Sequence, residues 1–143
     1  MKWQLISPQH AKVEYNQHMT YPRTIAIIQA RMSSSRLPGK VLLDLGGQPA
    51  LAWVIQRARR ARLLSGVLTA TTTDPADDPI AELCARLDTP CFRGHPFDVL
   101  DRYYQAARSA EAEAIIRITA DCPLIDPAQI DELIAAFFEQ GVD

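Results

Sequence analysis

The sequence has no long hydrophobic run, and nowhere do apolar residues continue for the length that a membrane-spanning helix needs. Residues 1–21 mix charged and polar side chains with apolar ones and contain no apolar stretch of the secretory-signal type. The three cysteines are odd in number and form no CxxC pair, which argues against a disulfide framework and a structural zinc site. These absences favour a cytoplasmic location and no membrane partner.

A strong charge of either sign is also missing. The formal net charge is −2 over 143 residues, so no overall positive field draws the protein to nucleic acid or to an anionic membrane. Hydrophobic residues make up 48% and charged residues 22%, a composition typical of a soluble globular domain. We therefore expect one folded domain with its own core and no nucleic-acid partner.

The two glycine-rich phosphate motifs GxGxxG and GxxxxGK[ST] are absent. What the sequence has instead is a regular alternation of strands and helices. Apolar runs rich in β-branched residues predict strands at 24–29, 66–72, 89–93 and 114–119. Helical periodicity predicts helices that begin near 50, 79, 99 and 127. This order predicts the α/β class, with an open, mainly parallel sheet and helices on both faces.

Three finer expectations follow from the same patterns. Residues 1–22 show no sustained period and are predicted to be a disordered extension, leaving 23–143 as the domain, so that a chain starting at Met19 should be equally stable. The strand at 114–119 is predicted to be buried. The third helix is predicted to place on one side the residues Val99, Leu100, Tyr103, Tyr104 and Ala107.

The loop after the first predicted strand is rich in positive charge and hydroxyl groups. It reads Gln29-Ala-Arg-Met-Ser-Ser-Ser-Arg-Leu-Pro-Gly-Lys40. Its cations and hydroxyls, together with backbone N–H groups, are donors that suit a polyphosphate; the side chains are Arg31, Ser33, Ser34, Ser35, Arg36 and Lys40. Ligands of open parallel sheets bind at the carboxyl ends of the strands, where this loop begins. From composition alone, a phosphate-binding loop and a solvated basic loop both remain open.

A second polar segment, Arg117 to Asp126, spans the end of the last predicted strand. Asp121 follows this strand by two residues and so is expected at the same sheet edge as the basic loop. A carboxylate there suits Mg²⁺, which keeps most of its waters and takes other ligands from substrate phosphates. An Asp that turns the chain before Pro123 is the alternative from the residues alone.

Several motifs, in the same order, resemble the cytidylyltransferases that make CMP-sialic acid and CMP-Kdo. The first, Ala30-Arg-x-x-Ser-x-Arg-Leu-Pro-Gly-Lys40, is similar to the opening motif of those enzymes. The longer pattern is closer to the spore-coat polysaccharide biosynthesis protein F branch, with Asp77-Asp78-Pro79-Ile80, Phe92-Arg-Gly94, Asp98-Val-Leu-Asp-Arg-Tyr103 and Thr119-Ala-Asp-Cys-Pro-Leu-Ile-Asp126. The resemblance covers the chain from Thr24 onward.

The resemblance implies a Rossmann-like nucleotide-diphospho-sugar transferase (GT-A-like) fold and a reaction with CTP. A sugar hydroxyl would attack the α-phosphorus of CTP, transferring CMP and releasing pyrophosphate, for surface polysaccharide or glycan biosynthesis. The acceptor would be an acidic sugar, such as a nonulosonic acid or a Kdo-like sugar, and Mg²⁺ would be the cofactor.

The resemblance also implies roles for individual residues. Arg31, Lys40 and Asp121 would be catalytic, the first two as phosphate contacts and Asp121 as the magnesium ligand. The serines and Arg36 of the loop would surround the phosphates. The nucleotide would also lie near Gln29, Ala30, Thr71, Thr72, Gly94 and Arg102.

Members of this family are substantially longer than the present chain. The difference predicts a truncated domain, and a homodimer only where the full-length domain is present. Two alternatives accompany the cytidylyltransferase prediction: a catalytically incomplete nucleotide-binding fragment, and a nucleotidyltransferase that uses another NTP.

Overall fold

The computed structural model describes residues 20–141. Four strands form one parallel sheet in the order β3-β2-β1-β4: β1 (Thr24–Gln29), β2 (Gly66–Thr72), β3 (Cys91–Gly94) and β4 (Ala114–Thr119). The helices are α1 (Ala50–Ala58), α2 (Asp78–Arg86), α3 (Val99–Ser109) and α4 (Pro127–Glu139), with short 3-10 turns η1 (Lys40–Leu42) and η2 (Pro75–Asp77). The predicted α/β class is confirmed. In this part of the chain, no helix is long and apolar enough to cross a membrane.

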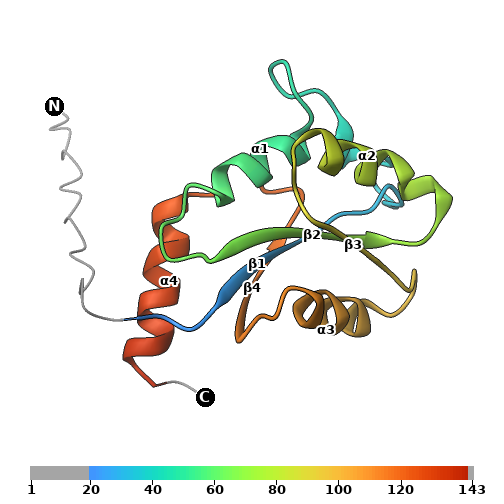
Figure 1. Cartoon of the computed structure of the whole chain (residues 1–143). Helices are drawn as coiled ribbons and strands as arrows, with labels where there is room; N and C mark the ends of the chain where they lie inside the picture. Colours follow the sequence, from blue (N-terminus) through green and yellow to red (C-terminus); the bar gives the residue numbers. More distant parts are fainter. Residues whose placement is uncertain (1–19, 142–143) are drawn as a thin grey trace, which may run out of the picture.

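The helices lie on both faces of the sheet, as Figure 1 shows for α1 and α2 on one face and α3 on the other. The chain moves outward from β1 to β2 to β3 through α1 and α2, and then returns through α3 to place β4 on the other side of β1. The direction of winding therefore reverses between β1 and β4. In open parallel sheets this reversal leaves a crevice beyond the carboxyl ends of the two strands.

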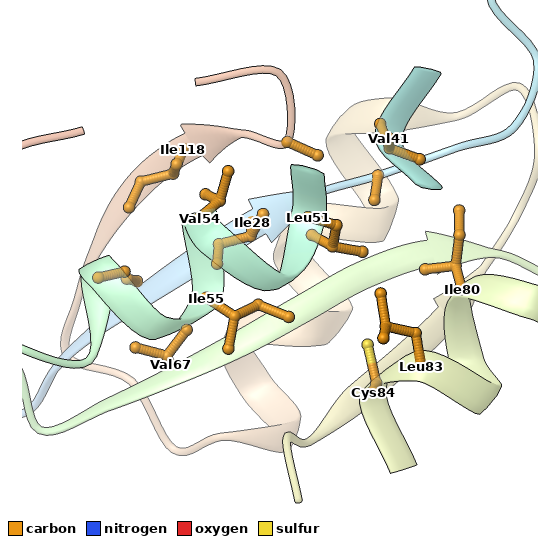
Figure 2. Close-up of a cluster of buried hydrophobic side chains, with 14 of the residues drawn as sticks. Ile28, Val41, Leu51, Val54, Ile55, Val67, Ile80, Leu83, Cys84 and Ile118 are labelled. Carbon is orange, nitrogen blue, oxygen red and sulfur yellow. The ribbon is translucent and has the colours of Figure 1, made fainter. Parts of the chain in front are cut away.

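The main core lies between the sheet and the helices α1, α2 and α4. Figure 2 shows the part of this core that α1 and α2 form with the strands. Leu51, Val54 and Ile55 of α1 pack onto the strands, where Ile28 of β1 is fully buried. Truncating such an aliphatic side chain to alanine costs about 2–5 kcal/mol. This packing holds the ends of β1 rigidly, so the loop that leaves β1 starts from a fixed position.

Three predictions about packing are corrected by the structure. The third strand begins at Cys91 rather than at residue 89. In α3 the buried residues are Arg102, Tyr103 and Ala106, whereas Leu100 is 82% exposed and Tyr104 is exposed. The reason is that α3 packs mainly on β1, β2 and β3, so a narrow stripe of the helix suffices.

The third correction concerns β4, which was expected to be buried. It is an edge strand that pairs only with β1 within residues 20–141, and alternate side chains remain open. Ile115 is 42% exposed as a result. The apolar composition of β4 suits a covered strand, but the described part of the chain covers only one of its faces.

The described chain starts just before β1. Tyr21 packs against Phe138 of α4, with ring centroids 6.0 Å apart, and its hydroxyl donates to Glu139 Oε1. Tyr21 thus belongs to the folded part. Residues 1–19 of the predicted extension lie outside the described residues.

Candidate functional site

A pocket of about 300 Å³ lies at the carboxyl ends of β1 and β4, where the winding of the sheet reverses. It is lined by Gln29, Arg31, Ser33, Ser34, Ser35, Arg36, Lys40, Val41, Arg117, Thr119, Ala120 and Asp121. The two segments that were singled out in the sequence therefore meet in one place, although they are far apart along the chain. Positive charge dominates this lining, since Asp121 is its one carboxylate.

The basic loop is held in shape by two hydrogen bonds that its backbone N–H groups donate. The N–H of Gly39 donates to the carbonyl of Met32 at 2.8 Å, which closes the segment 32–39. Gly39 has φ +70°, and a Cβ at this position would lie 3.3 Å from Met32 Cε, so a larger residue would be strained there. The N–H of Met32 in turn donates to Asp77 Oδ1 at 2.7 Å.

Asp77 is a positioning residue that the sequence reasoning did not recognise as such. It is buried, and its second oxygen accepts a hydrogen bond from the Thr72 hydroxyl at the end of β2. The carboxylate therefore ties the start of the basic loop to the neighbouring strand. The Asp77-Asp78-Pro79 motif was the available signal, but nothing in its spacing revealed the contact with Met32.

Lys40 and Asp121 form an ion pair in the pocket, with Nζ 2.6 Å from Oδ2. The hydrogen bond from Lys40, followed by one from Thr119, holds the pKa of Asp121 below its ordinary value. Asp121 is thus an anion at neutral pH and partly open to solvent, and an adjacent cation already interacts with it. Both partners are exposed enough that the pair itself adds little stability.

The carboxylate of Asp121, together with the basic loop beside it, fits a magnesium ion that is shared with a phosphate ligand. Within residues 20–141 there is no group of three or more His, Cys, Asp or Glu side chains that could hold a metal. Mg²⁺ is commonly bound by one or two carboxylates, with waters and substrate phosphates as its other ligands. Asp121 could supply one such carboxylate beside a loop whose cations and hydroxyls suit the phosphates.

Not all predicted nucleotide residues line this pocket. Thr71, Thr72 and Ala30 are buried, and the Ala30 N–H is used in a 3.0 Å hydrogen bond to Ala70 O. Their nucleotide contacts stay predictions.

Gly94 and Arg102 lie against each other and are not part of the pocket lining. Arg102 is 1% exposed, and its Nη1 donates to the carbonyl of His95. A Cβ at position 94 would come within 2.9 Å of Phe92 Cε1 and 3.0 Å of Arg102 Cγ. Glycine is therefore needed so that α3 can approach β3, and a nucleotide role for either residue stays a prediction.

Arg117 and Thr119 of β4 are pocket residues that the sequence reasoning missed. They point to the same face of β4, in register with Ile27 and Gln29 of β1. The available signal was an arginine inside an otherwise apolar strand, Ala114-Ile-Ile-Arg-Ile-Thr119. A charged residue in such a strand needs an opening or a partner.

The basic, hydroxyl-rich loop at the reversal point of a parallel sheet places this chain among α/β domains with a ligand crevice of the kind that suits phosphate groups. Residues 25–143 match the cytidylyltransferase family, and the chain belongs to that family.

Individual relatives agree with this assignment. The chain is 38% identical over 121 residues to the spore coat polysaccharide biosynthesis protein SpsF of Bacillus subtilis, covering 82% of this chain and 50% of that protein. The structure resembles a cytidylyltransferase from Leptospira borgpetersenii, with a TM-score of 0.79, 34% identity, and coverage of 83% and 50%. It also resembles a CMP:2-keto-3-deoxy-manno-octonic acid synthetase complexed with CTP, with a TM-score of 0.74, 26% identity, and coverage of 84% and 49%. The chain thus spans about half the length of these relatives.

Proposed function

We propose that this chain provides the nucleotide-binding half of a sugar cytidylyltransferase that binds CTP with Mg²⁺ and transfers CMP to a sugar with release of pyrophosphate. The observation that carries the proposal is the meeting of Arg31, Arg36, Lys40 and Asp121 in one pocket at the reversal point of the sheet. Cations with an isolated carboxylate suit a metal-bound polyphosphate better than they suit a neutral ligand.

The proposed roles follow from the position of each group. Arg31 and Lys40 bind the phosphates and offset the negative charge that develops on them, and Ser33, Ser34 and Ser35 donate further hydrogen bonds. Asp121 ligates Mg²⁺, which when bound polarises a phosphate oxygen. Transfer of this kind needs mainly positioning and charge neutralisation, so it requires no protein nucleophile.

The acceptor and the setting are inferred from what similar proteins are called. One similar structure is a synthetase that acts on 2-keto-3-deoxy-manno-octonic acid, and a relative is named for spore coat polysaccharide biosynthesis. We therefore propose an acidic sugar as the acceptor, a role in surface polysaccharide biosynthesis, and a cytoplasmic setting. A homodimer is proposed only for the full-length domain.

Nucleotide binding is the decisive measurement, because the chain spans half the length of its relatives. We would titrate the purified chain with CTP, UTP, ATP and GTP in Mg²⁺ by calorimetry, and assay pyrophosphate release in parallel with an acidic sugar. Saturable, Mg²⁺-dependent binding with preference for CTP is expected. Preference for UTP, ATP or GTP over CTP would favour a nucleotidyltransferase that uses another base, and binding without pyrophosphate release would favour a catalytically incomplete fragment. No binding of any nucleotide would refute the proposal.

A further inference from the structure

Arg117 is held in a defined position at the β4 side of the pocket. Its guanidinium carbon lies 5.5 Å from the centroid of the Tyr103 ring on α3, within the range of a cation–π contact. Tyr103 is itself buried in the smaller core cluster beneath α3, so the ring is a fixed support. A long, flexible side chain is thereby restrained beside the pocket that it lines.

Within residues 20–141, no carboxylate forms an ion pair with Arg117. Among residues 20–141 the ion pairs are Lys40 with Asp121 and Arg93 with Asp78, and neither includes Arg117. The lone carboxylate of the pocket, Asp121, is engaged by Lys40. A restrained guanidinium at a pocket wall, with five donors in a planar fork, is suited to a carboxylate or phosphate of a ligand.

The position of Arg117 separates it from the phosphate loop. Arg31, Arg36 and Lys40 come from the segment 31–40 that follows β1, whereas Arg117 comes from the neighbouring strand β4. The nucleoside is predicted to lie toward the ends of β2 and β3, near Thr72 and Gly94. The wall formed by β4 is therefore the part of the pocket that remains for the second substrate.

We propose that Arg117 binds the carboxylate of an acidic acceptor sugar and thereby selects for acidic over neutral acceptors. This inference rests on the proposed function, because it assigns the loop to the triphosphate. An anionic acceptor must approach an anionic triphosphate, and the repulsion between them is strong where water is partly excluded. A fixed cation at the acceptor side offsets that repulsion and orients the sugar through two parallel hydrogen bonds.

The test compares an acid with its own neutral derivative. The ligands are 2-keto-3-deoxy-manno-octonic acid and its methyl ester, each titrated into the chain saturated with CMP and Mg²⁺, and binding is followed by ligand-observed NMR. Arg117→Gln should weaken binding of the acid about tenfold or more, the scale of a lost hydrogen bond to a charged group. Ester binding should be unchanged, and so should CTP binding measured separately. Arg117→Lys should restore part of the affinity for the acid, because it keeps the charge without the planar fork.

Arg108→Gln is the matched control. Arg108 also lies over a tyrosine of α3, with its guanidinium carbon 5.8 Å from the Tyr104 centroid, but it is not part of the pocket lining. It should leave acid, ester and CTP binding unchanged.

Several results would overturn the inference. If the native chain binds CTP but not the acid, or if Arg117→Gln and Arg117→Lys both bind the acid normally, Arg117 is not the acceptor site. If CTP binding falls with Arg117→Gln, the residue belongs to the nucleotide site. If CTP does not bind the native chain at all, the proposed function fails and the acceptor role fails with it.

Discussion

Lys40 is the residue whose role in the pocket can be measured most directly. Its ammonium enters the pocket from the end of the basic loop, and its described ion pair is with Asp121 at the pocket wall. We expect Lys40→Ala to weaken CTP binding by about 1.5–3 kcal/mol, the value of a hydrogen bond to a charged group. The thermal midpoint should barely move, because the residue is only half-buried and its ion pair is partly exposed. Calorimetric titration with CTP and Mg²⁺ measures the change, and Arg60→Ala, an exposed cation outside the pocket lining, is the control. Unchanged affinity in Lys40→Ala would remove this residue from the phosphate site.

Asp121 has a sharper test, because its two possible roles predict opposite results. Asp121→Asn keeps the shape but removes the negative charge that a hard cation needs. We expect the gain in CTP affinity on adding Mg²⁺ to disappear. In EDTA the variant should bind CTP at least as well as the native chain, because Lys40 is no longer paired with a carboxylate and is free for the phosphates. Titrations with CTP in Mg²⁺ and in EDTA, beside melting curves, measure both effects. A large loss of stability with Mg²⁺ dependence intact would make Asp121 a turn residue.

The sequence predicted which loop residues meet in the pocket better than it predicted the residues around them. Arg31, Lys40 and Asp121 were found because charged groups directly follow apolar strands, and the carboxyl ends of parallel strands meet at one edge. Arg102 was assigned from its motif alone, and the structure places it behind Gly94, where it bonds to a backbone carbonyl. A sequence motif indicates that a set of residues belongs together. It does not distinguish the residues that contact a ligand from those that hold the surrounding backbone in place.

At the scale of elements, α4 is attached to the loop after α1 by a buried carboxylate. Asp131 is 4% exposed, and its two oxygens accept the N–H groups of Arg62 at 3.0 Å and Leu63 at 2.8 Å. We expect Asp131→Asn to lower the free energy of unfolding by about 1–3 kcal/mol, because the amide NH₂ cannot accept and leaves one partly buried N–H without its acceptor. Urea denaturation measures the loss.

The neighbouring Glu132→Gln is the control for this change. Glu132 is exposed on the same helix, and surface substitutions of this kind stay within about 0.5 kcal/mol. CTP affinity should be normal in both variants, because α4 contributes no residue to the pocket. If Asp131→Asn weakened CTP binding without loss of stability, α4 would have to be coupled to the site.

The elements themselves were predictable because their patterns are local. Apolar runs placed β1, β2 and β4 correctly, and the alternation with helices predicted the parallel sheet. What failed was the burial of β4 and the buried face of α3. Both depend on which neighbours lie beside an element, and the pattern within Ala114–Thr119 does not specify whether a strand will pair on one side or two. The position of Arg117 in the pocket was overlooked for the same reason, since a strand expected to be buried on both faces offers a charged side chain neither solvent nor a ligand pocket.

At the scale of the whole molecule, the sheet has a pocket at each end. The arginine side chains of the two pockets differ in whether they bind backbone carbonyls. The second pocket, of about 590 Å³, lies at the amino ends of β1 and β2 and includes Arg23 and Arg59. Arg23 Nε donates to Ala110 O, and Arg59 donates to the carbonyls of Leu87 and Asp88. These guanidinium groups also line a pocket, but they are already engaged by backbone carbonyls. Polyphosphate binding is therefore expected at one end of the sheet only.

This difference between the two ends of the sheet predicts which segments CTP should protect from hydrogen exchange. A ligand that binds only the folded state at about 100 times its dissociation constant adds about 2.7 kcal/mol of stability, so CTP with Mg²⁺ should raise the thermal midpoint by several degrees. Amide hydrogen exchange should slow in the segments 31–40 and 119–121, which contribute residues to the pocket, and the first of these is anchored by the hydrogen bond from Met32 to Asp77. It should not slow more than global stabilisation requires at Ser65 and Gly66, which line the opposite pocket and serve as an internal control. Lys40→Ala should reduce the protection of 31–40 at equal CTP concentration, because less of the protein is then bound. Protection centred on residues 64–68 instead would place the nucleotide at the amino ends of the strands and would contradict the site proposed for this family member.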